Sequence, residues 1–159
     1  MPSSVRKICH AAFCKCERLK KVVINEGLAV LGTEKPANCA RVFCGVFDRS
    51  AVEDVRLPST LKKIECSVFQ NCEHLKNIKL PHGLEKIGLS CFRNSAIEEV
   101  TFPASVKEVG VSAFLDCKQL KNVQLNEGLE KLGENAFSGS AISSVTLPST
   151  LRIVEAKTF

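Results

Sequence analysis

The chain has 159 residues, of which 45% are hydrophobic and 25% are charged; this is the composition of a folded globular protein and excludes a disordered one. The formal net charge is +5 and basic and acidic residues are interspersed, so the sequence favours acidic partners only weakly. No run approaches the roughly 20 apolar residues that cross a bilayer, and residues 1–7 lack an apolar signal segment. The sequence therefore predicts no membrane insertion in this segment.

A repeated pattern runs along the whole chain. Each repeat contains L-x-x-I-x-x-x-x-F, as in Leu61 to Phe69 and Leu84 to Phe92. From Phe69 onward the phenylalanines are spaced 23, 22, 23 and 22 residues, so long and short coils alternate. The repeated phenylalanines are Phe13, Phe47, Phe69, Phe92, Phe114, Phe137 and Phe159. Because about 22 residues hold too few inward side chains to form a core alone, the coils are expected to stack.

The second coil carries an insertion. Phe13 and Phe47 are 34 residues apart rather than 23, which leaves 11 extra residues at positions 33–43. Inserted residues in solenoids are extruded as loops. An aromatic side chain beside basic ones is a plausible anchor for a partner, so Lys35, Arg41 and Phe43 are candidate contact residues. The alternative is that Phe43 only packs against Phe47.

A second pattern, L-x-x-I-x-L-P, follows each phenylalanine and predicts a short strand with its apolar side chains inward. It begins at Leu75, Ile97, Leu120 and Ile142. The outward positions vary while the inward ones do not, as on a scaffold that displays a binding face; the alternative is an ordinary solvated strand surface. The predicted partner-binding surface is Lys21, Val23, Asp54, Arg56, Asn77, Lys79, Glu99, Thr101, Asn122, Gln124, Ser144 and Thr146.

The first strand of each coil adds an outward row of lysines. The row comprises Lys7, Lys63, Lys86 and Lys131, and it is interrupted by Val30, Glu108 and Ile153. A lysine row attracts polyanions. Nucleic acid or glycosaminoglycan binding nevertheless needs aromatic platforms as well, and the outer face has no evident ones. Polyanion binding is therefore kept as the alternative function, with nucleic acid the less favoured ligand.

The repeat closely resembles the BspA-like leucine-rich repeats. Gly88, Gly110 and Gly133 match the glycine of that pattern, Ala113-Phe114 matches its Ala-Phe pair, and Cys117 matches its cysteine, as Cys16 and Cys72 do in other coils. The resemblance implies a leucine-rich repeat solenoid, mainly β, with right-handed stacked coils of 22–23 residues, parallel strands, and short turns or 3-10 segments. Residues 1–159 are then one domain of about seven coils, incomplete at both ends and expected to be a piece of a longer chain.

Of the nine cysteines, Cys16, Cys72 and Cys117 at the repeat position and Cys91 before Phe92 are interpreted as core residues. Cys16, Cys72 and Cys117 lie two coils apart, about 10 Å, which exceeds the Cα separation a disulfide allows. The spacings Cys9-His10-x3-Cys14-x-Cys16 and Cys39-x4-Cys44 are not paired C-x-x-C, so the sequence predicts no metal. A loop disulfide between Cys39 and Cys44 is the alternative under oxidising conditions.

No enzymatic constellation or cofactor motif is evident. His10, His74 and His82 fall in turns of three different coils, and the glycines sit at repeat positions, where positive φ is the expected reason for them. The sequence thus predicts a non-enzymatic protein-binding or adhesion module, with polyanion binding or a structural spacer as alternatives. The resemblance favours the cell surface or secretion, the free thiols and missing signal allow the cytoplasm, and the uncapped ends suggest end-to-end association.

Overall fold

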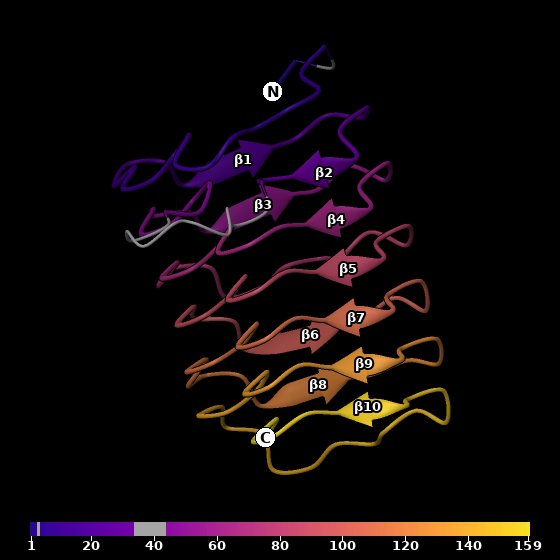
Figure 1. Cartoon of the computed structure of the whole chain (residues 1–159). Helices are drawn as coiled ribbons and strands as arrows, with labels where there is room; N and C mark the ends of the chain where they lie inside the picture. Colours follow the sequence, from indigo (N-terminus) through magenta and orange to yellow (C-terminus); the bar gives the residue numbers. More distant parts are fainter. Residues whose placement is uncertain (3, 34–43) are drawn as a thin grey trace, which may run out of the picture.

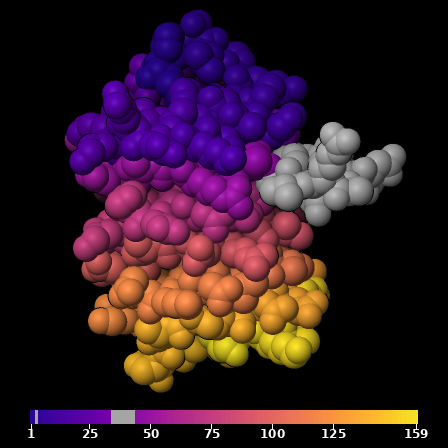
Figure 2. Space-filling model, turned by 90° about the vertical axis from the view of Figure 1, so that its left-hand side faces the viewer, coloured from indigo at the N-terminus to yellow at the C-terminus, as the bar shows by residue number. Residues whose placement is uncertain are grey.

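The computed structural model describes residues 1–2, 4–33 and 44–159. The chain winds into flattened coils that stack along one axis, with the N-terminal coil at one end and the C-terminal coil at the other (Figure 1). In the space-filling view the coils follow one another as successive bands of colour (Figure 2). Over the described ranges the coils are joined by turns, and no residue is helical or in a 3-10 segment. The mainly β leucine-rich repeat fold predicted from the sequence is confirmed.

One side of the stack is a continuous parallel sheet (Figure 1). Its strands pair in the order β10-β9-β7-β5-β4-β2, with each inward residue facing its counterpart in the next coil, as Ile64 faces Ile87. The strands are β2 (Val30–Leu31), β4 (Lys63–Ile64), β5 (Lys86–Ile87), β7 (Glu108–Val109), β9 (Lys131–Leu132) and β10 (Ile153–Val154). This register is the one that the repeat alignment predicts.

The opposite strands form a broken ladder. They are β1 (Lys21–Val23), which pairs with β3 (Asp54–Arg56), and β6 (Glu99–Thr101), which pairs with β8 (Asn122–Gln124). Asn77 adds a single bridge to Glu99. The strands predicted after Leu75 and Ile142 are wrong as strands, although every residue concerned is described. Both segments still bond to a neighbouring coil, as Glu98 N–H does to Lys76 O and Ala141 N–H to Leu120 O, but in these described residues the bonds do not continue as a ladder.

Stacked phenylalanine rings form the centre of the core. Consecutive ring centroids from Phe13 to Phe159 are 4.9–5.4 Å apart, and each pair of rings is within 16° of parallel. The five inner rings are completely buried, whereas Phe159 at the end of the column is 48% exposed. Phe13 stacks on Phe47 although 34 residues separate them in sequence, so the extra residues of this coil do not disturb the column.

Each coil reverses direction at two turns. At one turn, proline ends the strand and its carbonyl accepts a hydrogen bond from the residue three positions on, as Pro58 does from Leu61. At the other, eleven of the residues that lie two before or two after a repeated phenylalanine take left-handed φ angles of 52–58°. All eleven non-glycine residues with positive φ are of this kind: Ala11, Lys15, Arg49, Ser67, Asn71, Ser90, Asn94, Ser112, Asp116, Asn135 and Lys157.

The expected positive φ is wrong for the repeat glycines Gly88, Gly110 and Gly133, which are not among the glycines with positive φ. They are required for a different reason. A Cβ at Gly133 would lie 2.6 Å from the backbone nitrogen of Val111 in the preceding coil, and one at Gly110 would lie 2.8 Å from the carbonyl carbon of Gly88. Glycine thus allows the backbones of adjacent coils to approach closely.

Cysteine and serine alternate along one buried column. Cys72 donates its thiol to the carbonyl of Phe47 at 3.1 Å, and its Sγ lies 3.8 Å from Oγ of Ser50 in the preceding coil. Cys117 makes the equivalent bond to Phe92 at 3.0 Å. Burial raises the pKa of the Cys72 thiol to about 12, which keeps it protonated and unreactive. The predicted core role is thus observed for Cys72 and Cys117, while Cys16 is only half-buried.

Candidate functional site

The predicted partner-binding residues lie together on the face of β1, β3, β6 and β8. Eleven of the twelve side chains are exposed, and Asp54 is half-exposed. The strand register aligns them in two columns, with Lys21 opposite Asp54 and Thr101 opposite Gln124. The structure therefore brings these residues onto one surface.

Two contacts between neighbouring coils order this face. Lys21 Nζ lies 2.8 Å from Asp54 Oδ2, and this hydrogen-bonded ion pair lowers the pKa of the Asp54 carboxyl. Thr101 Oγ1 donates to Gln124 Oε1 at 3.5 Å. The ion pair is largely exposed to solvent, so its contribution to stability is small. These contacts position side chains rather than stabilise the fold.

Three hollows open on this face and run into one another. The first has a volume of about 660 Å³, and its lining residues include Asp54 and Lys79. The second, of about 680 Å³, has Asn77 and Thr101 in its lining. The third, of about 490 Å³, has Glu99 and Thr146 in its lining. Neighbouring hollows share lining residues, so we treat them as one trough that crosses five coils. Ten of the twelve predicted residues line it: Asp54, Arg56, Asn77, Lys79, Glu99, Thr101, Asn122, Gln124, Ser144 and Thr146.

The trough has an apolar floor and mixed polar walls. The floor includes Val100, which is buried, and Val123 and Val145, which are half-buried. The walls carry both charge signs, with Arg56 and Lys79 near Asp54 and Glu99. An apolar centre with a polar rim is typical of surfaces that bind proteins.

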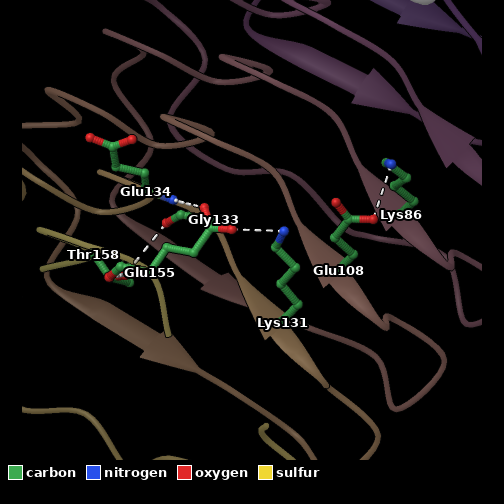
Figure 3. Close-up of polar contacts among 7 residues, drawn as sticks. All are labelled: Lys86, Glu108, Lys131, Gly133, Glu134, Glu155 and Thr158. Atoms are coloured by element: carbon green, nitrogen blue, oxygen red, sulfur yellow. Dashed lines mark hydrogen bonds and ion pairs between the residues drawn. The ribbon is translucent and has the colours of Figure 1, made fainter. Parts of the chain in front are cut away.

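Two lysines of the row on the continuous sheet, Lys86 and Lys131, are paired with acidic residues (Figure 3). Lys86 Nζ lies 3.0 Å from Glu108 Oε2, and Lys131 Nζ lies 2.8 Å from Glu155 Oε1. Glu155 also accepts a hydrogen bond from the backbone N–H of Glu134 at 2.9 Å. These partners lower the pKa of Glu155 and raise that of Lys131, so both stay charged and paired. The row is therefore not a continuous basic stripe.

At the proline turns, glutamate side chains form hydrogen bonds with the next coil, a feature that was not predicted from the sequence. Glu26 accepts hydrogen bonds of 3.0 Å from the backbone N–H and the hydroxyl of Ser59 and one of 3.1 Å from the N–H of Thr60. Glu127 repeats the arrangement with Ser149 and Thr150. The signal was present in the sequence as Asn-Glu-Gly-Leu twice, each followed one coil later by Pro-Ser-Thr.

The other candidate residues from the sequence are those of the insertion, the histidines and the cysteines. Lys35, Arg41, Phe43 and Cys39 lie outside the described residues. The histidines His10, His74 and His82 are all exposed, in three different coils, as the sequence predicts. Cys14 and Cys44, which belong to different sequence spacings, come together with Asp48.

The comparisons with known proteins identify the repeat. The model of the BspA type leucine rich repeat region matches residues 1–42 and 41–159, with six copies. The chain belongs to the BspA-type leucine-rich repeat family. Membership accounts for the stacked coils and the repeat glycines of these BspA-type repeats, and the resemblance noted from the sequence is confirmed.

Solved structures of bacterial leucine-rich repeat proteins share this BspA-type fold. A leucine-rich repeat protein of T. pallidum is 28% identical with a TM-score of 0.77, over 87% of this chain and 63% of its own. One from Bacteroides ovatus is 31% identical with a TM-score of 0.78, over 92% of this chain and 36% of its own. The pneumococcal vaccine antigen PcpA, 24% identical with a TM-score of 0.68 over 86% of this chain and 36% of its own, shows the fold alone.

This BspA-type chain thus spans less than two thirds of the length of either of the first two proteins. No curated protein matches the sequence. A helix long and apolar enough to cross a membrane is not found among residues 1–2, 4–33 and 44–159.

Proposed function

We propose that the chain is a non-enzymatic protein-binding module and that its trough holds an extended polypeptide segment of the partner. The observation that carries the proposal is the continuity of the trough along ten outward residues of neighbouring coils. A role in adhesion at a cell surface is part of the same proposal, since the family resemblance favours it.

The dimensions of the trough support an extended segment. Adjacent coils are 4.9–5.4 Å apart, as judged from the stacked rings, so five coils with four spacings give a length of about 20 Å. An extended chain rises about 3.3 Å per residue. Roughly six residues of a partner therefore fit along the trough, with apolar side chains toward the valine floor and polar ones toward Arg56, Lys79 and Glu99.

The charge distribution favours a protein over a polyanion. Eight ion pairs join basic and acidic side chains in the described part of the chain, and seven of them link neighbouring coils. The trough itself is lined by both basic residues, Arg56 and Lys79, and acidic ones, Asp54 and Glu99. A polyanion site needs several unneutralised cations in line, because its affinity comes from counterion release.

The test is selection from a displayed random-peptide library on the immobilised chain. Enriched peptides are then measured against Thr101→Trp, which fills the middle of the trough, and Lys118→Trp, which places the same side chain on an exposed turn. We expect the first variant to weaken binding about tenfold or more, which is about 1.4 kcal/mol, and the second to leave it unchanged.

Two results would contradict the proposal. Equal binding by both variants would remove the trough from the functional surface. Tight binding to heparin that falls steeply with salt would favour the polyanion function instead.

A further inference from the structure

We propose that Cys14, Cys44 and Asp48 form a binding site for zinc or a similar thiophilic divalent cation. The Sγ atoms of Cys14 and Cys44 and a carboxylate oxygen of Asp48 all lie within 4.8 Å of one another. Two thiolates and a carboxylate are a donor set suited to Zn²⁺, whose tetrahedral shell would then have one position left for water. The site is separate from the trough and does not depend on the proposed function.

The buried carboxylate of Asp48 is the observation that points to a ligand. Asp48 is only 1% exposed, and burial of a charged carboxylate is costly unless it is compensated. Asn71 Nδ2 donates to its Oδ1 at 2.9 Å, but Oδ2 is buried and receives no hydrogen bond in the described part of the chain. Arg49 Nη1 forms an ion pair with Oδ2 at 3.6 Å, beyond hydrogen-bonding range, on a side chain that is 48% exposed. A cation bound to Oδ2 would complete this partial compensation.

The three side chains sit on a backbone that holds them in place. Three hydrogen bonds join the first coil to the second at this point: Ala11 N–H to Cys44 O at 3.1 Å, Phe13 N–H to Val46 O at 2.8 Å, and Lys15 N–H to Asp48 O at 2.8 Å. The ring of Phe13 is stacked on that of Phe47 directly beside the site. Donors fixed in this way need little rearrangement to bind a metal ion.

The donor set is not a general property of the repeat. Cys14 and Asp48 both follow the repeated phenylalanine, and Cys44 precedes it by three residues. In the next three coils, the position of Cys44 is taken by Cys66, Leu89 and Val111, and the position of Asp48 by Gln70, Arg93 and Leu115. Only the contact between the first two coils combines two thiols with a carboxylate, so the cluster is a local addition to the scaffold.

Burial, the hydrogen bond with Cys44 and the negative charge of Asp48 together raise the pKa of the Cys14 thiol to about 11, so a metal ion must displace its proton. A bound divalent cation reverses this balance, because it stabilises thiolate and carboxylate together. The sequence predicted no metal because Cys14 and Cys44 belong to separate spacings, and it is the stacking of the first coil on the second that places them together.

The experiment measures Zn²⁺ and Co²⁺ binding by the full chain with its thiols kept reduced. Elemental analysis after dialysis should give a single equivalent of zinc, and Co²⁺ should produce thiolate-to-metal charge-transfer absorption. Cys14→Ser and Asp48→Asn should each weaken binding about tenfold or more, the range seen when support of a metal site is removed. Cys66→Ala is the matched control, because it removes the equivalent of Cys44 one coil further on and should bind as wild type does.

The outcomes separate the proposal from its competitors. Circular dichroism of each variant is the control for intact coils. Asp48→Asn keeps the shape of the side chain, and its amide oxygen can still accept the hydrogen bond from Asn71. Absence of zinc from the reduced wild type, or equal binding by all the variants, would overturn the proposal. So would a Cys14–Cys44 disulfide, detected by mass, that persists under the reducing conditions and consumes both thiols.

Discussion

Truncation of the central ring of the phenylalanine column tests the coil alignment most directly. Phe92 is completely buried, with its ring centroid 5.3 Å from that of Phe69 and 4.9 Å from that of Phe114. We expect Phe92→Ala to lower the free energy of unfolding by about 3–5 kcal/mol, which is the usual loss for a buried phenylalanine. Each lost ring pair adds about 0.5–1.5 kcal/mol to what area alone predicts, so the upper part of the range is expected.

The cavity left by Phe92→Ala cannot collapse easily. The backbone N–H of Phe92 donates to Ala113 O at 2.7 Å and that of Phe69 to Cys91 O at 2.8 Å, so the coil spacing is fixed on both sides. The matched control is Phe159→Ala, where the ring is 48% exposed and has a single stacked neighbour among the described residues. It should cost less than half as much as Phe92→Ala.

Urea unfolding followed by far-ultraviolet circular dichroism measures both variants. If Phe92→Ala unfolds within about 0.5 kcal/mol of wild type, or if the exposed terminal ring costs as much as the buried one, the stacked column does not hold the coils together and the reasoning fails.

Three further predictions follow from features of single coils. Deletion of residues 33–43 should keep the coils in register and change stability by only about 1 kcal/mol, because loop length contributes weakly; loss of cooperative thermal unfolding would show that the segment is part of the core. Gly133→Ala should destabilise by about 1–3 kcal/mol through its 2.6 Å approach to backbone, whereas Gly83→Ala, with a nearest contact of 3.2 Å, should cost less in the same urea assay. The lowered pKa of Glu26 and Glu127 gives stability that is present above the ordinary glutamate pKa of about 4.3 and is lost as the pH falls through the folded-state pKa. A double Glu→Gln variant should therefore lose less stability than wild type between about pH 5 and 3. An unchanged dependence of stability on pH would refute a stabilising role of these glutamate hydrogen bonds.

The sequence predicted the stacking because stacking is the only way for short coils to bury their apolar positions. The spacing of Phe69, Phe92 and Phe114 alone aligned the columns, and the register of Val100 with Val123 agrees with that alignment. Alternation within L-x-x-I-x-L also placed the outward residues correctly.

Features that depend on the distance between coils were not predictable in the same way. The repeat pattern is the same where the ladder pairs, between Glu99 and Asn122, and where it is interrupted, between Asn122 and Ser144. The contact of Cys14 with Cys44 and Asp48 joins two coils, so the spacing of residues within either coil does not reveal it.

The difference between the two faces has a mechanical consequence. The six-stranded sheet is paired without interruption from β2 to β10, so this side resists stretching along the stack. On the trough side, the described residues form two paired segments, β1 with β3 and β6 with β8, and Asn77 adds a single bridge, so fewer ladder hydrogen bonds resist separation of the coils there. The stack is therefore expected to bend by changing the spacing of the coils on the trough side while the six-stranded sheet keeps its length. Curvature and trough width would then change together, and a partner that spans the coils would also fix the curvature of the solenoid.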